Sequence, residues 1–268
     1  MFDINEVCID NKDMKAKEIE RSILTNYRKS IFRPFTKAIT DYNLLEDGDK
    51  IAVCISGGKD SLVMAKCMQE IERHGKKRIK CVFMVMNPGY NDENLKKIIE
   101  STKEIGIDVT VVDSQIFAAV KNANHKSPCY ICAKMRRGFL YNAAQELGCN
   151  KIALGHHFDD VIETTFLSML YNGIFNTMLP MLNSQNFPGM KLIRPLFYVK
   201  EQDIKAWVKY NELFFIDCAC KVTKKDLGKR LEIKKLTEEL VKMYKNADIN
   251  IFNSMFNVNK NTTKYIDE

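Results

Sequence analysis

The segment KIAVCISGGKDSLVMAKCMQEIERHG, residues 50–75, decides the fold of this chain. Its first part, residues 50–56, is a short apolar run rich in β-branched side chains, which predicts a buried strand. After the string SGGKDS, apolar residues recur along one helical face as far as Gly75, where the predicted helix ends. The segment therefore predicts a strand, a glycine-containing turn and a helix in direct succession.

The same alternation continues along the chain. Further strands are predicted at residues 80–87, 108–114, 151–157 and 190–196, and further helices at residues 92–106, 127–148, 158–173 and 199–213. Such alternation predicts an α/β fold in which a doubly wound parallel sheet carries helices on both faces. We expect a helical N-terminal extension (1–45), the α/β domain (46–215) and a C-terminal segment (216–268) with a cysteine pair and a basic helix. The Asn-rich tail from Asn246 is predicted to be partly disordered.

Composition restricts the class of protein. The 268 residues carry a net charge of +7 and a pI near 8.8, which favours a polyanionic partner. Nine cysteines without a secretory signal indicate a reducing compartment, so we expect a cytoplasmic protein. The longest uncharged run, between Glu163 and Lys191, is interrupted by prolines and amides, so no membrane span is expected.

The string SGGKDS, residues 56–61, is suited to binding an anion. Its two glycines allow a tight turn that directs several backbone N–H groups to one point, and the following helix adds its positive end. It is not a Walker A loop, because Asp60 follows Lys59 and the earlier glycine is missing. A plain glycine turn between strand and helix is the alternative.

A second polar string, GHHFDDVIETT, follows the fourth predicted strand. Ligands of open parallel sheets lie beyond the carboxyl ends of the strands, so Gly155 and His156 are expected at the same edge as SGGKDS. Simple N-capping of the next helix by Asp159 or Asp160 is the alternative, and a metal site built from both histidines and Asp160 is a weaker one.

Two thiols, Cys129 and Cys132, begin a predicted helix at i and i+3, and two arginines follow. The helix start and the arginines favour thiolates, so the pair fits a redox disulfide, half a zinc site or part of an iron–sulfur site. Cys218 and Cys220 are candidates to complete such a site, or else they are small buried residues. The remaining cysteines are expected to be packing residues: Cys8, Cys54, Cys67, Cys81 and Cys149.

Together these strings resemble a known family. SGGKDS after a strand resembles the PP-loop of the ATP pyrophosphatases, and GHHFDDVIETT resembles the element GHxxDDxxET of PP-loop tRNA-modifying enzymes. With CYICAKMRRGF and IRPL added, the stretch from about Lys50 to Lys221 resembles the tRNA 2-thiocytidine synthetase (TtcA) family. The resemblance implies an ATP-dependent tRNA thiolase that adenylates C2 of a cytidine, at position 32 of the anticodon loop, and replaces its oxygen with sulfur.

The resemblance also implies roles for individual residues. Lys59 would neutralise pyrophosphate, Asp60 would hold Mg²⁺, Asp160 would serve Mg²⁺ or the nucleotide, and Gly155 and His156 would line its pocket, with Met86 against adenine. Phosphate contacts are implied for Ser56, Gly57, Gly58, Lys59, Asp60 and Ser61. A [4Fe-4S] cluster is implied on three cysteines: Cys129, Cys132 and a third that is Cys218, narrowly favoured, or Cys220.

This chain departs from the family in two places. It has CAC where the family has two cysteines separated by two residues, and its C-terminus is rather short. Cys8 is the only cysteine near the N-terminus, which argues against the uridine thiolases with N-terminal zinc-binding pairs. Lysidine synthetases share the loop but lack the paired cysteines of this chain.

The implied partners are tRNA and a sulfur donor such as a cysteine desulfurase, and a homodimer is compatible with the resemblance. Residues 221–235 carry seven basic and two acidic side chains, which suits an RNA backbone or a solvated helix face equally well. Arg28, Lys29 and Arg33 are further candidates for tRNA contact. The alternatives are another PP-loop adenylating sulfurtransferase or ligase acting on a small molecule, and a non-enzymatic module that binds ATP or carries a cluster.

Overall fold

The computed structural model describes residues 4–114, 116–117, 128–215, 224–259 and 261, with side chains except at 4–13, 128–133 and 224–227. In chain order the elements are α1 (Ile4–Leu24), the π-helical turn η1 (Arg28–Phe32), α2 (Arg33–Asp41), β1 (Lys50–Ile55), α3 (Lys59–His74), β2 (Lys80–Asn87), α4 (Asp92–Glu104), β3 (Thr110–Asp113), α6 (Pro128–Glu146), β4 (Lys151–Ala153), α7 (Phe158–Asn172), β5 (Met181–Asn183), β6 (Lys191–Ile193), α8 (Glu201–Tyr210), α9 (Lys224–Met243) and α10 (Ala247–Ser254). Among the described residues, no helix is both long and apolar enough to cross a bilayer.

The strands form one sheet in the order β3-β2-β1-β4-β6-β5, and every neighbouring pair is parallel except β5 with β6. The predicted doubly wound α/β class is confirmed. The winding reverses between β1 and β4, which pair directly, with Ala52 opposite Ile152. In such sheets ligands bind at the reversal point, beyond the carboxyl ends of the strands. The loops after β1 and β4 therefore flank the position where a ligand is expected.

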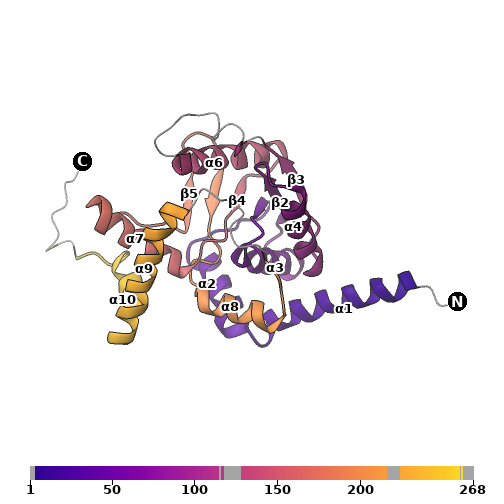
Figure 1. The fold of residues 1–268 in the computed structure, drawn as a ribbon, viewed down its shortest axis with the longest axis horizontal. Coiled ribbons are helices and arrows are strands. Elements are labelled where there is room, and N and C mark those ends of the chain that lie inside the picture. The colour runs from indigo at the N-terminus through magenta and orange to yellow at the C-terminus, as the bar shows by residue number, and fades with distance from the viewer. Residues whose placement is uncertain (1–3, 115, 118–127, 216–223, 260, 262–268) are drawn as a thin grey trace. The chain divides into compact units, whose positions relative to one another are not determined.

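The sheet is buried on both faces, as a parallel sheet between helices requires. Ile51, Val53 and Ile55 of β1 pack in the same core as α3 and α8, whereas Ala52 and Cys54 pack in a second core with α6. Figure 1 shows α3 and α6 on opposite sides of the sheet. Successive side chains of a strand point to opposite faces of the sheet, and both faces of β1 are buried. Side chains on both faces are therefore apolar, which explains the continuous apolar run in the sequence of β1.

The chain divides into two compact units. The first comprises the described residues of 1–157 and 180–220, with the whole sheet, and the second those of 158–179 and 221–268. In the second unit α7, α9 and α10 pack together: the rings of Phe158 and Phe252 stack at 4.6 Å, and Thr165 Oγ1 lies 3.3 Å from Met255 Sδ. The expectation of a partly disordered tail is wrong for Ala247–Ser254, because the buried side chain of Phe252 holds α10 against α7.

Candidate functional site

The SGGKDS loop (residues 56–61) turns the chain from β1 into α3, and it depends on Gly57. This residue has a φ of +84°, and a Cβ built on it would lie 2.6 Å from Ile98 Cγ1 of α4. Both the left-handed backbone and the close approach exclude a side chain. Gly58 precedes α3 with φ −83°, and among the described residues no side chain caps this helix start. The positive end of α3 therefore faces the loop.

Two serines hold the SGGKDS loop in shape. Ser61 Oγ donates to Gly58 O at 2.8 Å and accepts from the Ser56 N–H at 3.2 Å. Ser56 Oγ donates to Ser61 Oγ at 3.2 Å and accepts from the Gly58 N–H at 3.4 Å. These bonds join the two ends of the loop and hold its backbone in one shape, which suits the binding of an anion.

Lys59 lies between two carboxylates. Its Nζ is 3.1 Å from Asp60 Oδ2 and 3.1 Å from Glu201 Oε1, and its side chain is only 16% exposed. Burial lowers the pKa of Lys59, but the charges of Asp60 and Glu201 outweigh it, so the net shift of this pKa is upward. Lys59 is therefore held as an ammonium ion in the loop, which is the form that neutralises phosphate charge.

The other oxygen of Asp60 fits a cation. Asp60 Oδ1 is buried and has no hydrogen-bond donor among the described residues; His157 Nε2 lies 3.8 Å away. A buried carboxylate oxygen without a donor is unfavourable by about 1–3 kcal/mol. Carboxylate oxygen is the donor type that Mg²⁺ prefers, so this atom fits the expected metal.

The loop after β4 approaches the SGGKDS loop through Gly155. A Cβ built on Gly155 would lie 3.1 Å from the backbone atoms Asp60 C and Ser61 N. Since β4 ends at Ala153 rather than at residue 157, Gly155, His156 and His157 lie beyond the strand, and His157 is buried beside Asp60. The structure thus brings together Ser56–Ser61, Gly155 and His157, and His156 lies between the latter two.

Met86 lies near the carboxyl end of β2, next to β1 in the sheet, where it pairs with Val112 of β3. It is partly buried. Its strand therefore ends at the edge of the sheet that carries the SGGKDS loop.

Asp160 belongs to the second unit, in the first turn of α7. Its Oδ1 lies 3.2 Å from Arg230 Nη2, and Glu163 Oε2 lies 3.3 Å from Arg230 Nε. The i, i+3 spacing of the two acids places both on the face of α7 that meets α9. From the sequence, Arg230 lies in a basic segment that suits an RNA backbone or a solvated helix face, and its contact with Asp160 was not predicted. The only signal for that contact was the spacing of the two acids.

The cysteines of the expected cluster are placed only by their backbone. Cys129 and Cys132 lie in the first turns of α6, at i and i+3 as predicted, and their side chains lie outside the description. Cys218 and Cys220 lie outside the described residues. Two thiolates at a helix start suit a cluster chemically, because the helix dipole lowers thiol pKa values.

Four other cysteines behave as packing residues, as predicted. Cys54, Cys67 and Cys149 are buried, Cys81 is partly buried, and all four are free thiols. Burial raises the pKa of Cys54 to about 12 and also raises the pKa of Cys67 and of Cys81. These thiols therefore stay protonated and are poor metal ligands.

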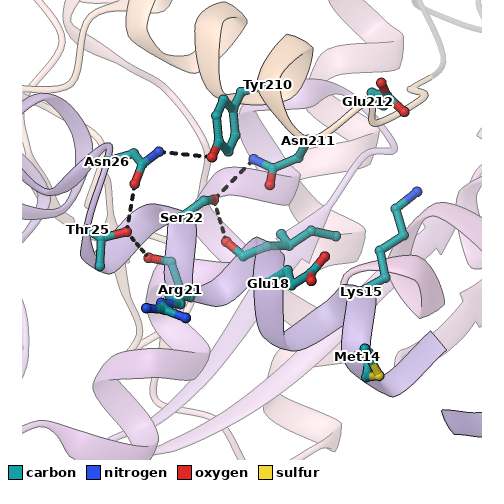
Figure 2. Close-up of a pocket in the computed structure, with 11 residues that line it drawn as sticks. Met14, Lys15, Glu18, Arg21, Ser22, Thr25, Asn26, Tyr210, Asn211 and Glu212 are labelled. Atoms are coloured by element: carbon teal, nitrogen blue, oxygen red, sulfur yellow. Dashed lines mark hydrogen bonds between the residues drawn. The ribbon is translucent and has the colours of Figure 1, made fainter. Parts of the chain in front are cut away.

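A cavity of about 850 Å³ lies away from these loops, between α1 and the end of α8 (Figure 2). Its polar groups bond to one another: Asn211 Nδ2 donates to Ser22 Oγ at 3.1 Å, and Asn26 Nδ2 donates to the Tyr210 hydroxyl at 3.0 Å. None of its lining residues comes from SGGKDS or from Gly155–His157. The candidate site at the carboxyl ends of β1 and β4 is therefore identified by the chemistry of its residues and not by this cavity.

The comparisons with known proteins show the family to which the chain belongs. Residues 26–224 match the family described as PP-loop domain. The chain is 34% identical over 236 residues to the tRNA-cytidine(32) 2-sulfurtransferase of Pseudomonas fluorescens, covering 86% of this chain and 84% of that protein. It is 35% identical over 240 residues to the protein of that name from Dechloromonas aromatica, covering 88% and 82%.

The chain therefore belongs to the PP-loop family, and within it to the branch that contains the tRNA-cytidine(32) 2-sulfurtransferases. The resemblance stated from the sequence motifs is confirmed. Among solved structures, the U34-tRNA thiolase NcsA from Methanococcus maripaludis with its [4Fe-4S] cluster has a TM-score of 0.67 and 23% identity, covering 91% of this chain and 78% of that one. This likeness supports the fold.

Proposed function

We propose that this protein is an ATP-dependent tRNA thiolase that converts a cytidine of the anticodon loop, at position 32, to 2-thiocytidine. The observation that carries the proposal is the SGGKDS loop, with Gly57 at a φ of +84° and Gly155 packed against its backbone. The chain belongs to the branch that contains the tRNA-cytidine(32) 2-sulfurtransferases, which supports tRNA as the substrate.

In the proposed reaction the C2 oxygen of the cytidine attacks the α-phosphorus of ATP, and pyrophosphate leaves. The loop N–H groups and the start of α3 bind the phosphates, and the ammonium of Lys59 neutralises the pyrophosphate as it departs. A [4Fe-4S] cluster bound by Cys129, Cys132 and Cys218 or Cys220 would supply sulfur to C2, with release of AMP. The protein contributes mainly position and charge.

Mg²⁺ belongs to the proposal as a partner of ATP. Asp60 would hold it through the buried Oδ1, and Asp160 would contribute a carboxylate to the metal or the nucleotide. The residues that would bind the phosphates and the metal are Ser56, Gly57, Gly58, Lys59, Asp60 and Ser61. The residues that would bind the nucleoside are Met86, Gly155 and His156. The nucleotide would therefore lie across the reversal point of the sheet.

The tRNA is proposed to contact the basic segment that includes α9. Lys229, Lys234 and Lys235 lie on this helix, and phosphate contacts of this kind are sequence-independent and weaken with salt. A cysteine desulfurase as sulfur donor, a homodimer and a cytoplasmic location complete the proposal.

Mass spectrometry of tRNA nucleosides from cells with and without the gene tests the function. We expect loss of 2-thiocytidine from the strain that lacks the gene and its return on complementation. Unchanged 2-thiocytidine would contradict the proposal. If ATP turnover also persisted in the purified protein, a PP-loop enzyme acting on a small molecule would take its place.

A further inference from the structure

Glu201 reaches the SGGKDS loop from outside both motifs. It is the first residue of α8, and its Oε1 lies 3.1 Å from Lys59 Nζ. The Glu201 side chain is 12% exposed, and its other oxygen, Oε2, accepts from Lys205 Nζ at 3.0 Å. The carboxylate therefore binds one lysine inside the site and one at the surface.

The position of Glu201 is fixed by its helix. Ile204 and Trp207, one and two turns later on α8, are fully buried, and Trp207 Nε1 donates to Ser22 Oγ of α1 at 3.0 Å. A carboxylate in the first turn also interacts favourably with the positive helix end. Glu201 therefore presents a rigid negative charge to Lys59.

The Lys59 ammonium pairs with two carboxylates, Asp60 and Glu201, and only Asp60 is expected to bind Mg²⁺ as well. Asp60 Oδ2 accepts from Lys59 Nζ at 3.1 Å, whereas Asp60 Oδ1 is the atom that fits Mg²⁺. A metal ion bound to Asp60 repels a neighbouring ammonium and competes with it for the same carboxylate. The Lys59 ammonium is mostly buried, so it needs a second carboxylate partner while Mg²⁺ is bound to Asp60.

We propose that Glu201 is a positioning residue that keeps Lys59 in the loop while Asp60 binds Mg²⁺, which rests on the proposed ATP-dependent function. A lysine ammonium has three N–H donors, so one donor on Glu201 leaves two for phosphate oxygens when Mg²⁺ occupies Asp60. Glu201 thereby separates the two positive charges of the site and leaves Asp60 to the metal.

Replacement of Glu201 by glutamine tests this role through the metal. In Glu201→Gln, Lys59 pairs with Asp60 alone and competes with Mg²⁺. We expect the Mg²⁺ concentration that half-saturates binding of a non-hydrolysable ATP analogue to rise about 5-fold or more in calorimetric titrations, while affinity at saturating Mg²⁺ changes by about 3-fold or less. In steady-state assays kcat for AMP formation falls by about 10-fold at saturating Mg²⁺ with KM for ATP nearly unchanged.

Asp203→Asn is the matched control, because it removes a carboxylate from the same turn of α8 and is expected to leave the Mg²⁺ requirement as in the wild type. An unchanged Mg²⁺ requirement in folded Glu201→Gln overturns the proposal, whatever happens to kcat. If that variant does not fold, Glu201→Asp is titrated instead; withdrawal of the carboxylate by one methylene is expected to raise the requirement about 2-fold, and no rise contradicts the role. Wild-type protein that binds no ATP analogue would instead contradict the proposed function.

Discussion

At the scale of single residues, the site depends on a glycine at position 57 and on a tight backbone approach at Gly155. At Gly57 the left-handed φ of +84° and the 2.6 Å approach to Ile98 both require glycine, and at Gly155 the backbone of Asp60 and Ser61 lies 3.1 Å from a Cβ. Gly58 differs: its φ is −83°, and the nearest atom to a Cβ is Ser56 Oγ at 3.5 Å. Adjacent glycines of one loop therefore have different tolerances.

Gly57→Ala is expected to weaken binding of an ATP analogue by about 10-fold or more and to cost about 1–3 kcal/mol of stability, because the loop must shift away from Ile98. Gly58→Ala is the control, and it is expected to lower the free energy of unfolding by about 1 kcal/mol or less. Calorimetric titration and urea unfolding measure both effects. Equal affinities for Gly57→Ala and the wild type would show that this loop does not hold the phosphates.

At the scale of elements, local sequence patterns predicted the strands, helices and turns that depend on residues close together in the chain. The strand at 80–87 and the turn into α3 were predicted because apolar runs and glycines mark them. The fourth strand was drawn four residues too long, since the polar GHH string follows Ala153 without a break in the pattern. β5 was not predicted because its three residues, MLN, lie between Pro180 and the polar residues Ser184, Gln185 and Asn186, which are typical of a loop.

The sequence motifs could not predict contacts between elements that are far apart in the chain. Glu201 and Lys59 are far apart in the chain and meet only because α8 packs beside α3, and Arg230 meets Asp160 because α9 packs on α7. The spacing of Asp160 and Glu163 is the only local signal for either pair, and it does not indicate the basic partner. The motifs thus predicted the SGGKDS loop, whereas the pairing of Glu201 with Lys59 in that loop came from the structure.

Arg230→Ala should destabilise the unit that contains α7 and α9. The Glu163 side chain is 9% exposed and Arg230 is 45% exposed, so removing the guanidinium takes a charged partner from a largely buried carboxylate. We expect a loss of about 1–2 kcal/mol in the free energy of unfolding, measured by urea denaturation. Lys235→Ala, on the exposed side of α9, should change it by about 0.5 kcal/mol or less. Equal effects of the two variants would argue against a structural role of the Arg230 contacts.

The helix start at Cys129 gives a prediction about the cluster. Protein prepared without oxygen should be brown, and Cys129→Ala or Cys132→Ala should each remove the colour while binding of an ATP analogue survives. A zinc site would be colourless, because a filled d shell has no such transitions. Cys149→Ala, at a buried packing position, should stay brown.

Single replacements of Cys218 and Cys220 identify the third ligand, and only one of them should bleach the protein. If both did, four thiolates would hold the cluster and no iron would be open to sulfur. If neither did, the third ligand would lie elsewhere in the chain. Visible absorption of the anaerobic protein decides among these results.

At the scale of the whole molecule, the proposed function requires a nucleotide site, a cysteine pair and a basic helix to act in one reaction. The sheet places the SGGKDS loop and Gly155 at its reversal point, and the chain belongs to the PP-loop family. The net charge of +7 suits a polyanionic substrate. Each part alone has other uses, so the central claim is that they act on one tRNA.

Anaerobic protein with a reconstituted cluster, a tRNA transcript with cytidine at position 32, ATP, Mg²⁺ and sulfide tests that claim most directly. The measurement is the ratio of 2-thiocytidine, from mass spectrometry of the digested tRNA, to AMP released. We predict about one 2-thiocytidine per AMP, and neither product when the target cytidine is replaced by uridine, because the reaction activates the base that it thiolates. Equal AMP release from both transcripts, without 2-thiocytidine in either, would contradict the claim.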